Sequence, residues 1–208
     1  SYPLNYPTPQ NANVQIFYAS ATSGETPQTW VKPQGASFVW FTLIGAGGTG
    51  DGGTGGGSGA VTNFMGPAFL IPDNLSISVA QGGSGRDTFI YYQLAVQTIL
   101  YASSGTTTGG GSAGNNFFTA MGFFQSTTGQ SGTAGVISAS STTFLSGGGV
   151  SSVTANYGYT VPSGGSGFFQ MSPIIVGTGG SVSGTGGIGC GGGYNFGVGG
   201  DGLAVIIT

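Results

Sequence analysis

The chain has 208 residues, of which 46 are glycine, and only 3% are charged, whereas an average domain has about 25% charged residues. Its two cations, Lys32 and Arg86, are too few to neutralise a track of phosphates, so the composition argues against nucleic acid as a partner. Disorder goes with few apolar residues and many charges, but here 38% of residues are hydrophobic, and we therefore expect an ordered fold.

The first 13 residues, SYPLNYPTPQNAN, predict an extended arm. They hold three of the nine prolines, and proline opposes helix because it fixes φ. Tyr2 and Tyr6, spaced along such an arm, suit docking on a neighbouring molecule. We therefore divide the chain into an N-terminal docking arm, residues 1–13, and a glycine-rich all-β domain, residues 14–208.

Apolar islands separated by turn signals predict strands in the rest of the chain. The strongest, residues 37–44 (SFVWFTLI), is apolar on both faces, so we expect it to be central and covered on both sides. Residues 88–102 (TFIYYQLAVQTILYA) are long enough for a helix, but their β-branched and aromatic content favours a strand. The other islands are residues 14–19, 29–31, 60–64, 75–80, 116–124, 150–161, 167–176 and 203–208. Together they predict an all-β fold, a single β-sandwich or jelly-roll-like domain with long glycine-rich loops.

Two glycine-rich fields interrupt the strands. Residues 45–59 contain ten glycines, and residues 177–202 contain fourteen. Ordering a backbone costs about 1–2 kcal/mol per residue, and glycine loses the most freedom. Two arrangements can offset this cost. Strands can hold each loop at both ends, or the glycine segments can stack as extended polyproline-II-like rods, in a polyglycine-II-like packing, that bond to one another.

The spacing of Gly45, Gly47 and Gly50 is that of a dinucleotide-binding turn. Such a turn needs a helix to follow, because the free N–H groups at the helix N-terminus hold the pyrophosphate. Here more glycine, threonine and serine follow, which oppose helix. No lysine follows a glycine run, so a P-loop is also excluded. We predict that the chain binds no cofactor.

Catalytic and metal-binding residues are scarce. The chain has no histidine, which excludes histidine-dependent triads and the usual zinc sites. Asp51 and Asp201, each in a Gly-Asp-Gly context, are weak candidates for a calcium site or an acid–base pair, but aspartate in such turns is usually a turn former. Cys190 is the only cysteine, and we expect it to be buried. No apolar run is long enough to span a membrane. We predict that the protein is not an enzyme.

A nearly uncharged surface leaves little repulsion between copies, so we expect a subunit covered by its neighbours. The aromatic candidates for such contacts are Tyr2, Tyr6, Trp30, Trp40, Tyr91, Tyr157, Tyr159 and Tyr194. Four of these tyrosines, Tyr91, Tyr157, Tyr159 and Tyr194, could instead stack on the sugar rings of a host-surface glycan. The alternative role for each is packing in the core or in an interface.

Several motifs together resemble a known family. Residues 30–35 (WVKPQG), the strand at 37–44 and the GAGG that follows it resemble the opening of the glycine-rich domain of phage tail fibres and other viral structural proteins. Residues 77–83 (ISVAQGG) and 199–207 (GGDGLAVII) resemble later parts of that domain. The resemblance covers residues 29–208 and is weakest over 93–176.

The resemblance implies an all-β body in which the opening and closing strands pair and the glycine loops gather at one end. It brings no catalytic residues. It implies a non-enzymatic structural protein of the virion, a capsid or fibre component that assembles with copies of itself and with other virion proteins. The alternatives are a receptor- or glycan-binding adhesin tip and a cellular extracellular filament protein.

Overall fold

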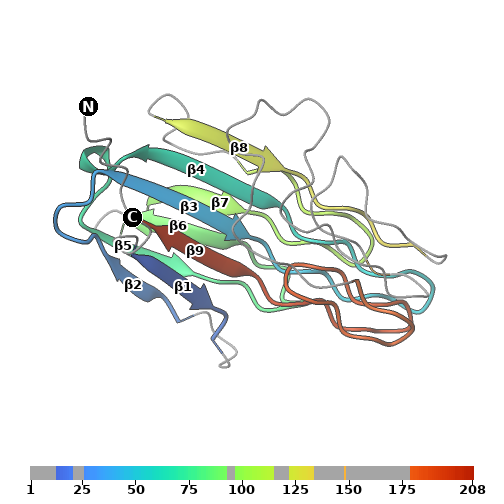
Figure 1. The fold of residues 1–208 in the computed structure, drawn as a ribbon. Helices are drawn as coiled ribbons and strands as arrows, with labels where there is room; N and C mark the ends of the chain where they lie inside the picture. Colours follow the sequence, from blue (N-terminus) through green and yellow to red (C-terminus); the bar gives the residue numbers. More distant parts are fainter. Residues whose placement is uncertain (1–12, 21–25, 93–96, 115–121, 134–147, 149–178) are drawn as a thin grey trace, which may run out of the picture.

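The computed structural model describes residues 13–20, 26–92, 97–114, 122–133, 148 and 179–208. Within them, nine strands form two antiparallel sheets, and one short 3-10 turn, η2 (Ala68–Leu70), is the single helical element (Figure 1). The all-β prediction is confirmed, and the two sheets are consistent with a β-sandwich.

The five-stranded sheet has the order β1-β9-β3-β4-β8. Its strands are β1 (Val14–Tyr18), β9 (Leu203–Ile207), β3 (Phe38–Ile44), β4 (Val61–Pro67) and β8 (Phe123–Thr127). β3 is central, as its apolar sequence predicts. It pairs with β9 in a register that places Thr42 opposite Val205, so the strand before the first glycine-rich field and the strand after the second are neighbours.

The four-stranded sheet has the order β2-β5-β6-β7. Its strands are β2 (Gln28–Val31), β5 (Asn74–Ser78), β6 (Thr88–Tyr92) and β7 (Gln97–Ala102). The island at 88–102 is therefore not one strand but two, and these pair antiparallel. The sequence does not predict the break between these strands, because residues 93–96 (QLAV) contain neither glycine nor proline. These four residues lie outside the described part.

Large apolar side chains fill the space between the sheets. Trp30 of β2 is fully buried and meets Phe41 of β3 edge to face, with ring centroids 5.8 Å apart and planes inclined by 75°. Phe41 also stacks on Phe64 of β4 at 6.2 Å. Leu75 and Ile90 add buried side chains from the other sheet. These contacts join β2, β5 and β6 to β3 and β4 in one core.

Some predicted elements fall outside the described residues. These are most of the arm, residues 1–12, and the islands at 150–161 and 167–176. The island predicted at 116–124 overlaps β8 only at its end, because the described strand begins at Phe123 and residues 115–121 are outside the described part.

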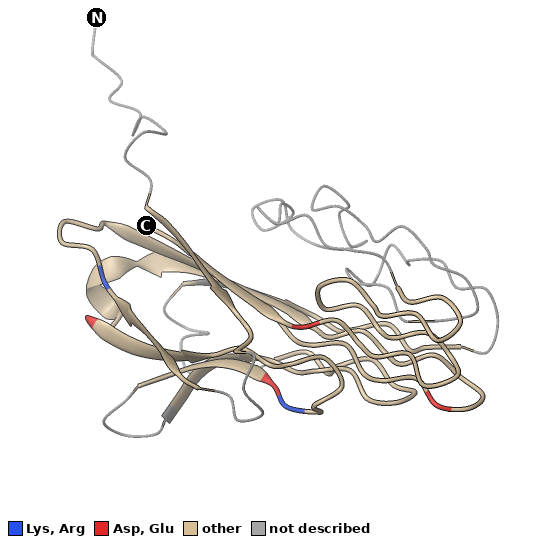
Figure 2. Ribbon diagram, turned by 90° about the horizontal axis from the view of Figure 1, so that it is seen from below, with Lys and Arg blue, Asp and Glu red and all other residues tan. Residues whose placement is uncertain are grey.

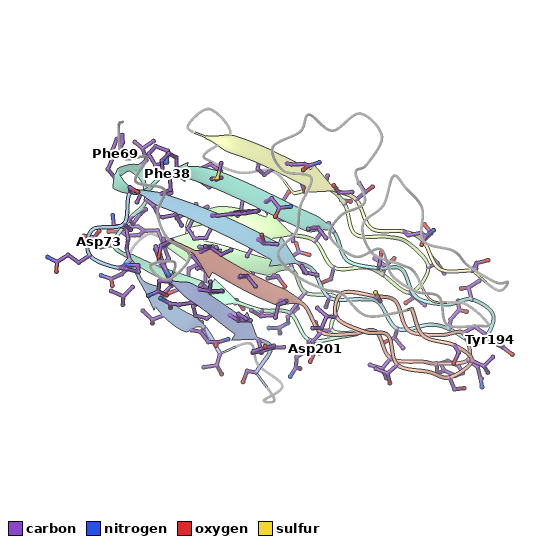
Figure 3. The ribbon with its side chains drawn as sticks, viewed as in Figure 1. Phe38, Phe69, Asp73, Tyr194 and Asp201 are labelled. Carbon is purple, nitrogen blue, oxygen red and sulfur yellow. The ribbon has the colours of Figure 1, made fainter. Side chains whose placement is uncertain are left out.

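The glycine-rich segments extend together from one end of the sandwich, and they form what we name the glycine body (Figure 1). It comprises the described residues 45–60, 103–114, 128–133, 148 and 179–202. Figure 3 shows that this part carries few side chains compared with the strands. With so few side chains to pack, its order must come from the backbone.

Residues 55–60 donate their backbone N–H groups to three neighbouring segments in rotation. Residues three apart donate to the same neighbour. The donor pairs are Gly55 and Ser58, Gly56 and Gly59, and Gly57 and Ala60, which bond residues 130–133, 189–192 and 103–106, respectively. The donor–acceptor distances are 2.8 to 3.0 Å. A three-residue repeat without bonds inside the segment is the geometry of the polyproline-II helix, and it lets one rod bond several others.

Close packing, rather than a special φ, requires glycine in these rods. A β-carbon added at Gly56 would lie 2.0 Å from the carbonyl oxygen of Gly48, and one at Gly57 would lie 1.9 Å from that of Gly109. Neither glycine has a φ in the left-handed region. Any side chain at these positions would force two backbones apart.

Candidate interaction sites

The Gly45-Gly47-Gly50 turn is part of the glycine body. The N–H of Gly45 donates to the carbonyl of Ala60, that of Gly47 to Gly200, and that of Gly50 to Gly197, at 2.8 to 2.9 Å. The next element along the chain is a strand, β4, so no helix begins at this turn. The amides that would hold a phosphate are therefore already bonded to the protein.

The two candidate aspartates lie apart. The bond from Gly47 to Gly200 places Asp201 beside Ala46, which is five positions before Asp51 on the same rod. At about 3.1 Å per residue, this spacing separates the aspartates by about 15 Å. Each carboxylate holds a different turn. Asp201 accepts the N–H of Gly82 at 2.8 Å. No group of three or more potential metal ligands occurs among the described residues.

The Asp51 side chain stabilises a tight turn formed by residues 51–54. Its Oδ1 accepts the backbone N–H groups of Gly53 at 2.7 Å and Thr54 at 2.5 Å. These two bonds hold the pKa of the Asp51 carboxyl below its ordinary value, because they favour the ionised form. The carboxylate is thus used locally as a turn former.

An ordered tip stands beside this turn. The carbonyl of Asp51 accepts the N–H of Asn195 at 2.6 Å, and Asn195 Nδ2 donates to Ser183 Oγ at 2.9 Å. Asn195 and Phe196 both have φ near +64°, a region that is unusual for a phenylalanine. Phe196 is nevertheless 69% exposed. Tyr194, half-buried, lies at this end of the molecule, opposite the end that carries Phe38 and Phe69 (Figure 3).

Lys32 stabilises the end of the molecule that carries Phe38 and Phe69. Lys32 Nζ donates to the carbonyls of Ala68 (3.1 Å) and Ile71 (2.8 Å) and pairs with Asp73 Oδ1 at 2.7 Å. Its side chain is only 17% exposed. Lys32 therefore fixes the turn that presents Phe69. It is one of the few charged groups in the ribbon of Figure 2.

β1 forms an open edge of the five-stranded sheet. Asn13 exchanges two backbone bonds with Thr208, at 2.9 and 3.0 Å. In an antiparallel ladder, alternate residues bond the partner strand, so Val14 and Ile16 direct their N–H and C=O groups away from β9. Their side chains are 52% and 49% exposed, and that of Tyr18 is 60% exposed. Among the described residues, the edge has no neighbouring strand, although the Tyr18 carbonyl accepts a hydrogen bond from Gln28 Nε2 at 2.8 Å. The edge at Val14 and Ile16 is thus both open and apolar.

A shallow pocket of about 380 Å³ opens on the outer face of β6 and β7. Its lining residues are Asp87, Phe89, Thr98, Tyr101 and Ser103. The Phe89 ring lies 5.3 Å from that of Tyr91, at 40°. None of the lining residues is a candidate from the sequence, which singles out only the neighbouring Tyr91. The pairing of β6 with β7 was the missing signal, because it places Tyr101 opposite Phe89.

The aromatic candidates have different positions. Trp30 is a core residue and presents no surface to another molecule. Trp40, Tyr91 and Tyr194 are half-buried and retain surface. Tyr2, Tyr6, Tyr157 and Tyr159 lie outside the described residues. Cys190 is fully buried.

No protein-family model matches the chain, and the comparison with curated proteins found no significant relative. The described part contains no helix that is long and apolar enough to cross a membrane.

Proposed function

We propose that this protein is a non-enzymatic structural protein of a virus particle, a capsid or fibre component that acts by self-assembly. The open edge of β1 carries the assembly part of the proposal. The sequence motifs of the glycine-rich domain support the virion part.

Proteins usually protect an edge strand with lysine, proline or a bulge, since an open edge pairs with other chains. β1 (VQIFY) has no charge and no proline, and its register with β9 is unbroken over five pairs. A second copy of this chain fits the edge. A two-fold axis at Ile16 would place Ile16 opposite Ile16 of the second copy, and Val14 opposite Tyr18. The three exposed side chains of each copy would then pair with apolar partners.

The scarcity of charge supports the same proposal. The formal net charge is −3, and none of the charged residues lies on β1 or β9. Little electrostatic repulsion therefore opposes the approach of two such edges.

A charge placed at the edge tests the proposal. Ile16→Lys in the full chain should lower the mass of the native assembly. In the paired edges, the substitution would place the ammonium groups of the two copies opposite each other. Val31→Lys is the matched control, since Val31 is also an exposed apolar residue (58%) on an edge strand, but of the other sheet. An unchanged mass for a folded Ile16→Lys would contradict the β1 interface.

The virion part needs a separate test. Mass spectrometry of purified virus particles from the source should recover the chain as a major component. Recovery only from an extracellular fraction free of particles would favour the cellular filament instead.

A further inference from the structure

We infer that the pocket on the outer face of β6 and β7 is a binding site for a neutral saccharide. This function goes beyond assembly and uses a different sheet from the β1 edge.

A β-bulge builds the site. The register between β6 and β7 shifts between Ile90 and Tyr91, so that Ile90 faces Leu100 while Tyr91 faces Thr98. The additional residue, Ile99, is only 5% exposed and joins the core. Without the shift, alternation would turn Thr98 inward. The bulge therefore keeps Thr98 on the outer face together with Tyr101, and bulges commonly re-aim side chains at functional sites in this way.

The aromatic side chains supply an apolar platform. Phe89, Tyr91 and Tyr101 lie on paired strands, which fixes their backbones, and all three residues are half-buried, so part of each remains accessible. Rigid aromatic rings offer a large contact area at low entropic cost. The apolar C–H face of a sugar ring is a suitable partner for such a platform.

The polar groups around the platform match hydroxyl groups. Thr98, Tyr101 and Ser103 carry hydroxyls that both donate and accept hydrogen bonds. Asp87 Oδ1 accepts the N–H of Ser104 at 3.0 Å, which orients the carboxylate. Its Oδ2 is 3.5 Å from Ser103 Oγ, at the outer limit of a bond, so it keeps acceptor capacity.

An organic cation is the competing ligand, because rings and a carboxylate also attract positive charge. The hydroxyl groups of Thr98 and Tyr101 favour the saccharide. A cation without hydroxyls would leave their donor protons unused, whereas sugar hydroxyls can satisfy both donors and acceptors.

Ligand-observed NMR of the full chain tests the inference. The probes are glucose, galactose, N-acetylglucosamine and lactose at millimolar concentration, with tetramethylammonium as the cation. We expect saturation transfer to at least one saccharide, and a loss of affinity of tenfold or more in Phe89→Ala and in Tyr101→Ala. Phe196→Ala, which removes an exposed ring at the tip, should bind as the unmodified chain does.

Three results would overturn the inference. They are no transfer to any of the saccharides, binding that survives both ring substitutions, and a preference for tetramethylammonium that Asp87→Asn abolishes. Circular dichroism of each variant separates loss of the site from loss of the fold. The same binding measurements in the Ile16→Lys variant show whether saccharide binding depends on assembly through the β1 edge.

Discussion

Gly47 lies so close to Cys190 that a β-carbon added to it would be 1.8 Å from the Cys190 carbonyl oxygen. These residues come from the two glycine-rich fields, which are far apart in the sequence. Similar approaches recur through the glycine body, where the atoms met are mostly backbone. The absence of side chains is therefore what allows the rods to exchange backbone hydrogen bonds.

Gly47→Ala should lower the free energy of unfolding by about 3 kcal/mol, the upper end of the usual cost of overpacking, because a backbone carbonyl cannot swing aside as a side chain can. Thermal or denaturant unfolding measures the change. Gly52→Ala is the control, since its β-carbon would meet only the Phe196 ring, at 3.8 Å, in an exposed turn. Equal losses in the two variants would refute the close-packing argument.

Lys32→Met should lower the free energy of unfolding by about 1–3 kcal/mol, because it leaves the carbonyls of Ala68 and Ile71 without their charged donor. Asp73→Asn should cost less than about 1 kcal/mol, since the Asp73 side chain is 78% exposed and an exposed ion pair contributes little. Chemical denaturation of both variants checks the order. A larger loss in Asp73→Asn would show that the ion pair, rather than the carbonyl bonds, holds the turn.

Acid should loosen the Asp51 turn only at low pH. The pKa of this carboxyl is lowered in the folded protein, so its stabilising contribution is complete above the unfolded pKa of about 3.9 and is lost as the pH falls through the folded pKa. The amide chemical shifts of Gly53 and Thr54 should therefore titrate below about pH 3.9.

The same titration in Asp51→Asn should be flat, because an amide accepts these bonds without ionising. A midpoint above the ordinary aspartate value in the unmodified chain would show that the two N–H bonds do not dominate the environment of the carboxyl.

The sequence predicts the strands well where apolar residues are flanked by glycine. β3 is the clearest case, since its apolar run ends at Gly45. The prediction from sequence fails between β6 and β7, because no glycine or proline separates these two antiparallel strands. Hydrophobic pattern specifies which residues are buried, but it does not show where one strand ends and the next begins when no glycine or proline separates them.

The pairing of the rods could not be predicted. Gly56 bonds Gly192 and Gly57 bonds Thr106, yet successive glycines have no side chains by which a partner could be told from sequence. For the same reason, the Gly45-Gly47-Gly50 spacing could be discounted as a cofactor turn but not assigned its partners. The pocket at Phe89 and Tyr101 depends on strand pairing and on a bulge, which the sequence does not display.

The native mass of the full chain, measured by sedimentation at low and at high salt, tests self-assembly most directly. Edge pairing through backbone bonds and apolar side chains is not screened by salt, so we predict a defined oligomer whose mass is the same in both conditions. A monomer at every concentration and at both salt levels would contradict the account.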